Sequence, residues 1–519
     1  MALGLSSVEH HMQSDTMPPP TLLENRDDAR SLEEASSATW QDWRSAGRYN
    51  LVILGGGPAG ILAAYAAAEL GARVALIERN LLGGTCLNTG CIPSKSILRT
   101  SQLYADMRGA ESFGAQVPKD IHVDFAAAMA RMRRIRARLG RRNSAERLSA
   151  LGIDVYFGAA RFTGPNTVAV NGTRLRFRKA LIATGSRPLI PTIPGLAEAG
   201  YLTHENVFDL TECPRRLLVI GGGPLGCELA QAFCRLGSQV TIVQREPMFL
   251  SQEERDAAQI LSASLARDGV DIHLNTSAVN VRVEGKHKLV DLVSDDNHNT
   301  VTVDQILVGV GRTPNVQGID LEAAGVEYDD IGGVRINDFL QTTNSRIFAS
   351  GDVCLEHKFT HIEDASARLV VRNALFWGRA RLSGLTIPWC TYTDPEIAHV
   401  GLYVTEAIRK GIPVKTFTVP MHDVDRAIAD GEEEGFVKIH VKEGTDRILG
   451  ATVVARHAGE MINDISLAIG SGIGLRVLAR VVHPYPTQAI AIQMAAAAYN
   501  STRVTPFRKW LLRRWLKCT

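Results

Sequence analysis

Residues 50–60, NLVILGGGPAG, set the architecture of the whole chain. The apolar run over 50–54 is typical of a buried parallel strand, and it leads directly into a glycine-rich turn. An alanine-rich helix is expected over 61–70 and a second strand over 73–77, which ends at Glu78. A strand, glycine turn, helix, strand and acidic residue in one compact unit are typical of a dinucleotide-binding fold.

Three glycines of this turn have separate physical tasks, and the acid completes the unit. Gly55 makes the tight turn, Gly57 lets the backbone approach a pyrophosphate, and Gly60 lets the helix pack closely. A carboxylate at the strand end accepts hydrogen bonds from a ribose. The predicted cofactor-binding residues here are Gly55, Gly57, Gly60 and Glu78.

The unit is repeated over 217–246. A short apolar strand at 217–220 is followed by GGGPLG, a helix reaching Leu236 and a strand over 239–243. Two such units imply two nucleotide cofactors, which excludes a simple one-cofactor dehydrogenase and indicates a flavin together with a nicotinamide. The binding residues predicted for this second unit are Gly221, Gly223 and Gly226.

The strand-end acid is replaced by Gln244 in the second unit, and Arg245 follows it. Without an acid, a 2′-phosphate meets no repulsion, and Arg245 or Arg255 could attract it. We therefore expect NADPH to be preferred, with NADH as the alternative.

Two cysteines lie close together in residues 83–95, GGTCLNTGCIPSK. Their spacing suits two thiols that meet across about one helical turn. Pro93 favours an early helix position, so Cys91 should lie near a helix N-terminus, where thiolate is favoured over thiol. A redox-active Cys86–Cys91 pair is the preferred interpretation. The alternatives are two buried structural cysteines or half of a zinc site, although no second ligand pair follows.

Composition limits the other function classes. A chain of 519 residues with 45% hydrophobic residues suffices for about three domains. A net charge of +2 gives no reason to expect a nucleic-acid partner. The other six cysteines are scattered, which fits a reducing, cytoplasmic location. We expect no transmembrane helix and no metal site, and a flexible extension over 1–48 with one short helix near 32–43.

The cysteine stretch closely resembles the active-site signature of class I pyridine nucleotide–disulfide oxidoreductases, the flavoproteins that include glutathione reductase, dihydrolipoyl dehydrogenase and mercuric reductase. The resemblance extends from about Tyr49 to Asn500. It implies an α/β fold with two Rossmann-like domains, for FAD and NAD(P), and a C-terminal α+β dimerisation domain. The implied boundaries are an FAD-binding part at 49–195, an NAD(P)-binding domain at 196–303, a second FAD-binding part at 304–384, a dimerisation domain at 385–505 and a basic tail at 506–519.

The resemblance also implies roles for individual residues. Cys91 would be the flavin-side thiol that forms the charge-transfer thiolate, and Cys86 the interchange thiol that meets substrate. Lys95 would pair with Glu228 beside flavin N5, where a cation stabilises negative charge arriving on the ring. The further FAD-binding residues implied are Gly84, Thr85, Ala183, Thr184, Gly185, Gly311 and Asp352.

The chain departs from the family where the proton donor is expected. Instead of His-Pro-Thr-x-x-Glu, residues 483–490 read HPYPTQAI, which puts Tyr485 at the histidine position and Ile490 at the glutamate position. A tyrosine, with a pKa of about 10, is a poor base near neutral pH. His483 could act as the acid–base residue instead, and the other interpretation is that His483 has a purely structural role. Mercuric reductases also carry a tyrosine here, but the chain has neither an N-terminal Cys-x-x-Cys nor paired C-terminal cysteines.

These observations lead to a homodimeric FAD flavoprotein that passes electrons from NAD(P)H through the dithiol to Hg(II) or another thiol-reactive acceptor. Reduction of a small disulfide is the first alternative. A catalytically impaired flavoprotein that acts as a membrane-associated partner is the second.

The tail over 507–519 has the pattern of an amphipathic helix. It suits either peripheral contact with the inner face of a membrane or packing on the dimer body. The apolar side comprises Leu511, Leu512, Trp515 and Leu516. The basic side comprises Lys509, Arg513 and Lys517.

Overall fold

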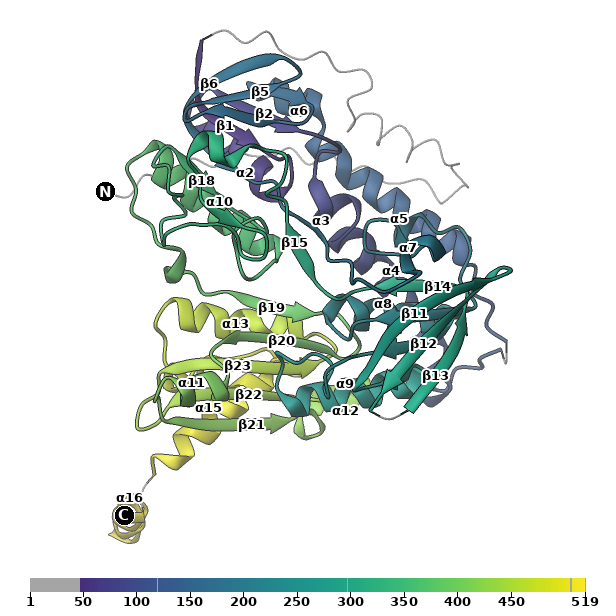
Figure 1. The fold of residues 1–519 in the computed structure, drawn as a ribbon. Helices are drawn as coiled ribbons and strands as arrows, with labels where there is room; N and C mark the ends of the chain where they lie inside the picture. The colour runs from purple at the N-terminus through teal and green to yellow at the C-terminus, as the bar shows by residue number, and fades with distance from the viewer. Residues whose placement is uncertain (1–46, 119, 296, 505, 519) are drawn as a thin grey trace.

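The computed structural model describes residues 47–118, 120–295, 297–504 and 506–518. The short helix expected near 32–43 lies outside the described residues. Figure 1 shows three packed bodies, with the final helix extending away from them. Mixed α/β architecture is therefore confirmed.

The first body is built on a largely parallel sheet with strand order β3-β2-β1-β6-β5-β4, and β18 also pairs with β6. Leu54 at the end of β1 faces Ile77 on β2 and Ile182 on β6, so the strand ends lie along one edge. The strands are β1 Arg48–Leu54, β2 Val74–Glu78, β3 Ile153–Phe157, β4 Arg161–Gly164, β5 Thr167–Val170, β6 Thr173–Ile182 and β18 Ile347–Ala349.

Small residues let two helices approach closely on this sheet. Helix α2 (Pro58–Glu69) packs against α10 (Thr360–Leu375), and their alanines lie in the same buried cluster. The helix predicted over 61–70 thus begins three residues earlier, at Pro58, because proline is well tolerated in the first turn. This close packing brings the second part of the domain, over 300 residues along the chain, onto the first glycine turn.

The second body repeats the pattern with the parallel order β10-β9-β8-β14, and an antiparallel sheet, β11-β12-β13, accompanies it. Helix α8 (Pro224–Arg235) follows its glycine turn. The strands are β8 Arg216–Ile220, β9 Gln239–Val243, β10 Asp271–His273, β11 Thr276–Glu284, β12 His287–Ser294, β13 Asn297–Val303 and β14 Gln305–Val308.

The boundary expected between residues 303 and 304 is wrong. Strand β14 lies beyond it, yet it pairs in parallel with β8, from Gln305 opposite Leu217 to Val308 opposite Ile220. The parallel sheet of the second body needs this strand to cover β8, so that body continues to Val308. The return to the first body is made by β15 (Arg312–Pro314), which pairs with β7 (Ser186–Pro188).

The third body carries the antiparallel sheet β19-β20-β23-β22-β21. Its central strand β23 is buried at every position, and α13 (Ala458–Gly470) and α15 (Ile490–Thr502) pack on the sheet. The strands are β19 Pro388–Thr391, β20 Glu396–Gly401, β21 Val414–Pro420, β22 Phe436–Lys442 and β23 Ile448–Ala455.

One helix joins the first body to the second. This helix, α4 (Cys91–Gly109), packs against α8 of the second body. The remaining α-helices are α3 Gly84–Asn88, α5 Phe125–Gly140, α6 Ala145–Ala150, α7 Leu196–Ala199, α9 Arg255–Asp268, α11 Val404–Arg409, α12 Asp425–Asp430, α14 Leu475–Leu478 and α16 Pro506–Cys518. No helix in the part of the chain that the structure describes combines the length and apolarity needed to cross a membrane.

Candidate active site

The two cysteines lie on separate helices rather than within one turn. Cys86 is in α3, and Cys91 is the first residue of α4. Gly90 precedes α4 at a tight bend, where a Cβ atom would lie 2.8 Å from the carbonyl oxygen of Thr85. The Cys86 and Cys91 thiols lie close enough to hydrogen-bond to one another, which shifts the pKa of each. The expected position of Cys91 at a helix N-terminus is confirmed.

The environment makes the two thiols unequal. The hydrogen bond with Cys86 lowers the pKa of Cys91 to about 6, despite the opposing effect of burial, with further help from Thr360 and Lys95. Thr360 Oγ1 lies 3.4 Å from Cys91 Sγ at the start of α10. The same hydrogen bond, together with burial, strongly raises the pKa of Cys86. In the reduced pair the negative charge therefore resides on Cys91.

Lys95 and Glu228 are brought together, as the family resemblance implied. Lys95 Nζ donates to Glu228 Oε2 at 2.8 Å, and the Glu228 side chain is only 5% exposed. Burial disfavours the charge on Lys95, but the pairing with Glu228 outweighs burial and raises the pKa of Lys95. The Lys95 ammonium also lies 4.6 Å from the centre of the Tyr392 ring. This places a permanent cation one helical turn after the Cys91 thiolate.

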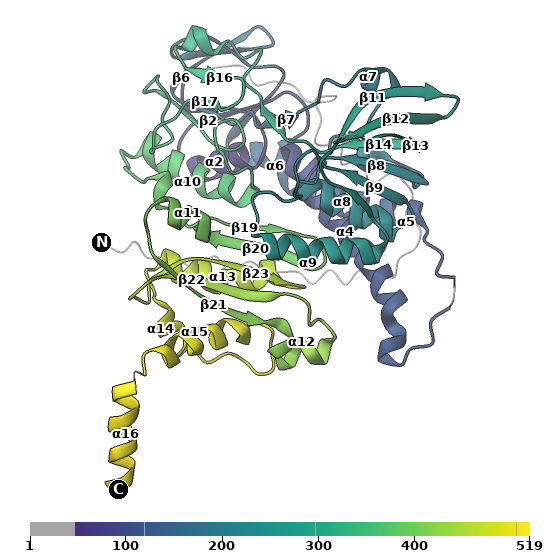
Figure 2. The same ribbon diagram turned by 60° about the horizontal axis from the view of Figure 1, so that its bottom comes forward.

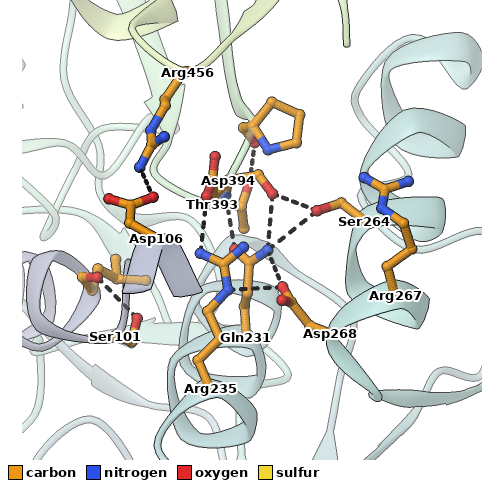
Figure 3. Close-up of polar contacts among 12 residues, drawn as sticks. Ser101, Asp106, Gln231, Arg235, Ser264, Arg267, Asp268, Thr393, Asp394 and Arg456 are labelled. Carbon is orange, nitrogen blue, oxygen red and sulfur yellow. Dashed lines mark hydrogen bonds and ion pairs between the residues drawn. The ribbon is translucent and has the colours of Figure 1, made fainter. Parts of the chain in front are cut away.

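One face of α8 ties this cation to the third body. Glu228 Oε1 accepts a hydrogen bond from the backbone N–H of Tyr392 at 2.9 Å. Gln231, three residues after Glu228, hydrogen-bonds to both the backbone N–H and the backbone C=O of Asp394. Arg235, seven residues after Glu228, pairs with the Asp394 carboxylate at 3.0 Å. Arg235 and Gln231 also contact Asp268 of α9, as Figure 3 shows. We call these residues, 228, 231, 235, 268 and 394, the α8 clamp.

The first glycine turn fits a dinucleotide pyrophosphate. A Cβ atom on Gly84 would lie 2.7 Å from Gly57 Cα, and a Cβ atom on Gly60 would lie 1.9 Å from the carbonyl oxygen of Gly55. No side chain can therefore fill this surface, and α2 begins here with no side-chain cap on its free N–H groups. Glu78, at the strand end, accepts from the N–H of Gly56 at 2.6 Å.

Most of the remaining predicted flavin ligands lie in a second set of hydrogen bonds and ion pairs, around Asp352 and Thr184. Asp352 Oδ2 accepts from Ser186 Oγ at 2.6 Å and lies 3.3 Å from Arg312 Nε. Thr184 is bonded through its side chain and backbone to Asn315, which orders the turn over 183–185. Gly185 and Gly311 have positive φ angles, of 68° and 134°. The contacts of these residues with a flavin stay predictions, as do those of Thr85 and Ala183.

The second glycine turn repeats the first closely. Gly221 has a φ of 107°, and a Cβ atom on Gly226 would lie 2.1 Å from the carbonyl oxygen of Gly221. Helix α8 begins after Gly223 without a side-chain cap. Arg245, the predicted phosphate ligand, is an exposed residue that pairs with Glu246. The turn therefore fits a second pyrophosphate.

The residues around 483–490 contact their own body within one chain. Tyr485 Oη donates to Asp425 Oδ2 at 2.7 Å, which raises the pKa of the Tyr485 hydroxyl. His483 Nε2 lies 3.5 Å from Asp464 Oδ2. Ile490 is the first residue of α15. The three residues would meet a dithiol only across a dimer, as the family resemblance implies.

Three neighbours of the predicted site were missed from the sequence. Thr360 and Asp425 act on Cys91 and Tyr485 from distant positions in the chain, and neither has a recognisable spacing. Tyr392 lies in residues 389–400, WCTYTDPEIAHV, and that stretch by itself does not reveal the contacts of Tyr392 with Glu228 and Lys95. Among the described residues, no three His, Cys, Asp or Glu side chains gather as they would around a metal ion.

Comparison with known protein families gives two matches. The family described as pyridine nucleotide-disulphide oxidoreductase matches residues 49–368. The dimerisation domain of the same family matches residues 387–496.

Individual proteins agree with these matches. A mercuric reductase from Staphylococcus aureus is 33% identical over 468 residues, covering 90% of this chain and 85% of its own length. A dihydrolipoyl dehydrogenase from Thermus scotoductus is 34% identical over 465 residues, covering 88% and 98%. The HOCl-induced flavoprotein disulfide reductase RclA from Escherichia coli superimposes with a TM-score of 0.78 at 29% identity, covering 86% and 99%. It has also been solved as a Cu(II) complex.

Proposed function

Because the chain belongs to the pyridine nucleotide-disulphide oxidoreductases, we propose that it is a homodimeric NAD(P)H-dependent reductase whose dithiol passes electrons to Hg(II) or another thiol-reactive acceptor. Members of this family use FAD and NAD(P)H. FAD, held by the glycine turn of α2 with Glu78 and Asp352, would supply the two-electron chemistry that links NAD(P)H to the cysteine pair.

The cysteine pair would take up these electrons as an inequivalent dithiol. Two electrons and one proton convert the disulfide into a Cys91 thiolate and a Cys86 thiol, because the pKa of Cys91 is lowered and that of Cys86 is raised. Lys95 would hold positive charge beside the reacting groups, and Glu228 keeps its ammonium in place. The glycine turns of α2 and α8 would hold the two pyrophosphates.

The observation that supports a soft acceptor is the pairing of Tyr485 with Asp425. Attack on a disulfide substrate requires Cys86 to lose a proton, and its raised pKa makes a nearby base important. The hydrogen bond to Asp425 raises the pKa of Tyr485, so the tyrosinate that could act as a base is even scarcer near neutral pH than in a free tyrosine. A soft metal ion displaces the proton from a thiol directly and needs no such base.

Reduction of a small disulfide is the second candidate function. It is supported by the 34% identity to a dihydrolipoyl dehydrogenase. Cu(II), which is bound to the similar reductase RclA in a solved structure, belongs among the metal acceptors to be tested.

A substrate screen separates the two candidates. We expect NADH or NADPH oxidation to be faster with Hg(II) or Cu(II), offered as thiol complexes, than with lipoamide or glutathione disulfide. The double variant Tyr485→His with Ile490→Glu should raise disulfide reduction by about tenfold or more, since a general base typically contributes at least 10²-fold. Thr487→Ala, in the same loop, is the matched control. Faster wild-type turnover with a disulfide would contradict the metal proposal.

A separate observation supports peripheral membrane contact. Helix α16 has five basic residues and no acidic one, and it stands away from the rest of the chain (Figure 2). Its apolar side chains are exposed, by 55% at Leu512 and 72% at Leu516. Exposed apolar and basic faces on one helix complement an anionic lipid surface. We infer that α16 docks on anionic lipid at the inner face of a membrane.

Deleting residues 506–519 should abolish co-sedimentation with vesicles that contain anionic lipid. Each basic residue contributes about 1 kcal/mol near such a surface, so binding should also fall steeply with added salt. A matched variant with Leu512→Gln and Leu516→Gln keeps the charge and should bind at least about tenfold more weakly. If the deletion instead lowers the dimerisation affinity and leaves vesicle binding unchanged, the tail packs on the dimer.

A further inference from the structure

The two dinucleotide units share one backbone contact but end in different side chains. In the first unit, the N–H of Gly56 donates to Glu78 Oε2 at 2.6 Å. In the second unit, the N–H of Gly222 donates to Gln244 Oε1 at 2.7 Å. In each unit the glycine and its side-chain partner are separated by 22 residues. Gln244 therefore occupies the place of the ribose-binding acid, without its charge.

A carboxylate lies two residues further along. Gln244 Nε2 donates to Glu246 Oε2, and Arg245 Nη2 lies 3.2 Å from Glu246 Oε1. The amide of Gln244 thus joins the glycine turn to a negative charge. The arginine that could attract a 2′-phosphate is held by the same carboxylate.

The loop that carries Glu246 is fixed to the glycine turn. The N–H of Leu250 donates to the carbonyl oxygen of Gly222 at 2.9 Å, and the N–H of Asn275 donates to that of Glu246 at 3.2 Å. A Cβ atom on Gly222 would lie 2.6 Å from Phe249 Cβ, so the loop packs directly on the turn. The backbone of Glu246 is therefore held in place, although its side chain remains 45% exposed.

We propose that Glu246 selects the nicotinamide nucleotide and favours NADH over NADPH. Its carboxylate supplies a negatively charged acceptor for the ribose hydroxyls, which the neutral amide of Gln244 cannot supply. The same charge repels a 2′-phosphate and neutralises Arg245. The NADPH expectation rested on Gln244 and on Arg245 or Arg255 as phosphate ligands, because a contact between Gln244 and Glu246 is not visible in the sequence. This inference rests on the proposed function, in which the second unit binds NAD(P)H.

Binding of nucleotide fragments tests the inference without turnover. ADP-ribose and 2′-phospho-ADP-ribose are titrated by calorimetry into the FAD-loaded wild-type dimer. We expect ADP-ribose to bind at least about tenfold more tightly than its 2′-phosphate. Glu246→Gln should shift this ratio by about tenfold or more towards the 2′-phosphate, and the ratio of kcat/KM for NADH and NADPH should follow. Adding Arg245→Gln to Glu246→Gln should remove the gain in affinity for the 2′-phosphate.

Glu327→Gln is the matched control, because Glu327 forms a similar exposed ion pair with Arg335, 3.3 Å apart. It should leave both affinities unchanged. Tighter wild-type binding of the 2′-phosphate, or an unchanged ratio in Glu246→Gln, overturns the inference while the proposed function stands. If neither fragment binds the FAD-loaded protein, the proposed function fails with it.

Discussion

Replacing Cys91 with serine is expected to lower turnover by about 10³-fold or more while FAD remains bound. Cys91 is the thiol that the structure prepares to be negative, since Cys86, Thr360 and Lys95 all lower its pKa. Serine fills the same space at the first position of α4 but does not ionise near neutral pH. The long-wavelength absorption that a thiolate gives beside a flavin should therefore be absent from the reduced variant.

The pH dependence of this absorption provides the direct measurement. A lowered pKa means that the thiolate is present above the pKa and is lost as the pH falls through it. In the anaerobically reduced wild-type protein, the band should be half-maximal near pH 6. Cys518→Ser, which changes an exposed cysteine on α16, is the control and should retain the band. A band that persists in Cys91→Ser, or is absent from the reduced wild type, would contradict the assignment of Cys91.

Features that depend on local spacing could be predicted from the sequence. The strand, glycine turn and helix of each dinucleotide unit lie within about thirty residues, and the structure has β1, α2 and β2 close to the expected positions. The pairing of Lys95 with Glu228 spans 133 residues, and it was predicted only because the family resemblance linked the two motifs. The redox centre was thus predicted in outline from short motifs.

Features that arise from packing between distant segments could not be predicted in this way. The contact between Tyr485 and Asp425 joins positions 60 residues apart, and that between Cys91 and Thr360 joins positions 269 apart. Strand β14 was placed in the wrong domain because a short apolar run does not reveal which sheet it completes. Side-chain contacts of this kind decide the chemistry here, since they set the charge on Cys91 and the basicity of Tyr485.

Replacing Arg235 with methionine is expected to cost about 3–5 kcal/mol of the free energy of unfolding. Arg235 is only 7% exposed, and it neutralises both Asp268 and Asp394. Methionine fills much of the same volume but leaves two carboxylates in a largely buried site without their cation. The melting temperature should fall by roughly 3–5 °C, and urea unfolding should show an earlier transition.

Arg267→Met is the matched control. Arg267 pairs with Glu434 across the same two bodies, but its side chain is 54% exposed, so its loss should cost at most about 1 kcal/mol. Adding Asp268→Asn and Asp394→Asn to Arg235→Met should recover part of the stability, because the unpaired charges are then removed.

The same variant tests whether the α8 clamp also serves the redox centre. Asp394 follows Tyr392 closely, and the Tyr392 N–H holds Glu228, which in turn holds Lys95. If the clamp positions this chain of contacts, Arg235→Met should raise the midpoint pH of the Cys91 thiolate band, because a displaced Lys95 no longer stabilises the thiolate. A destabilised variant with an unchanged midpoint would restrict the clamp to stability. An unchanged melting temperature would instead show that Asp268 and Asp394 do not need Arg235 as their counter-ion.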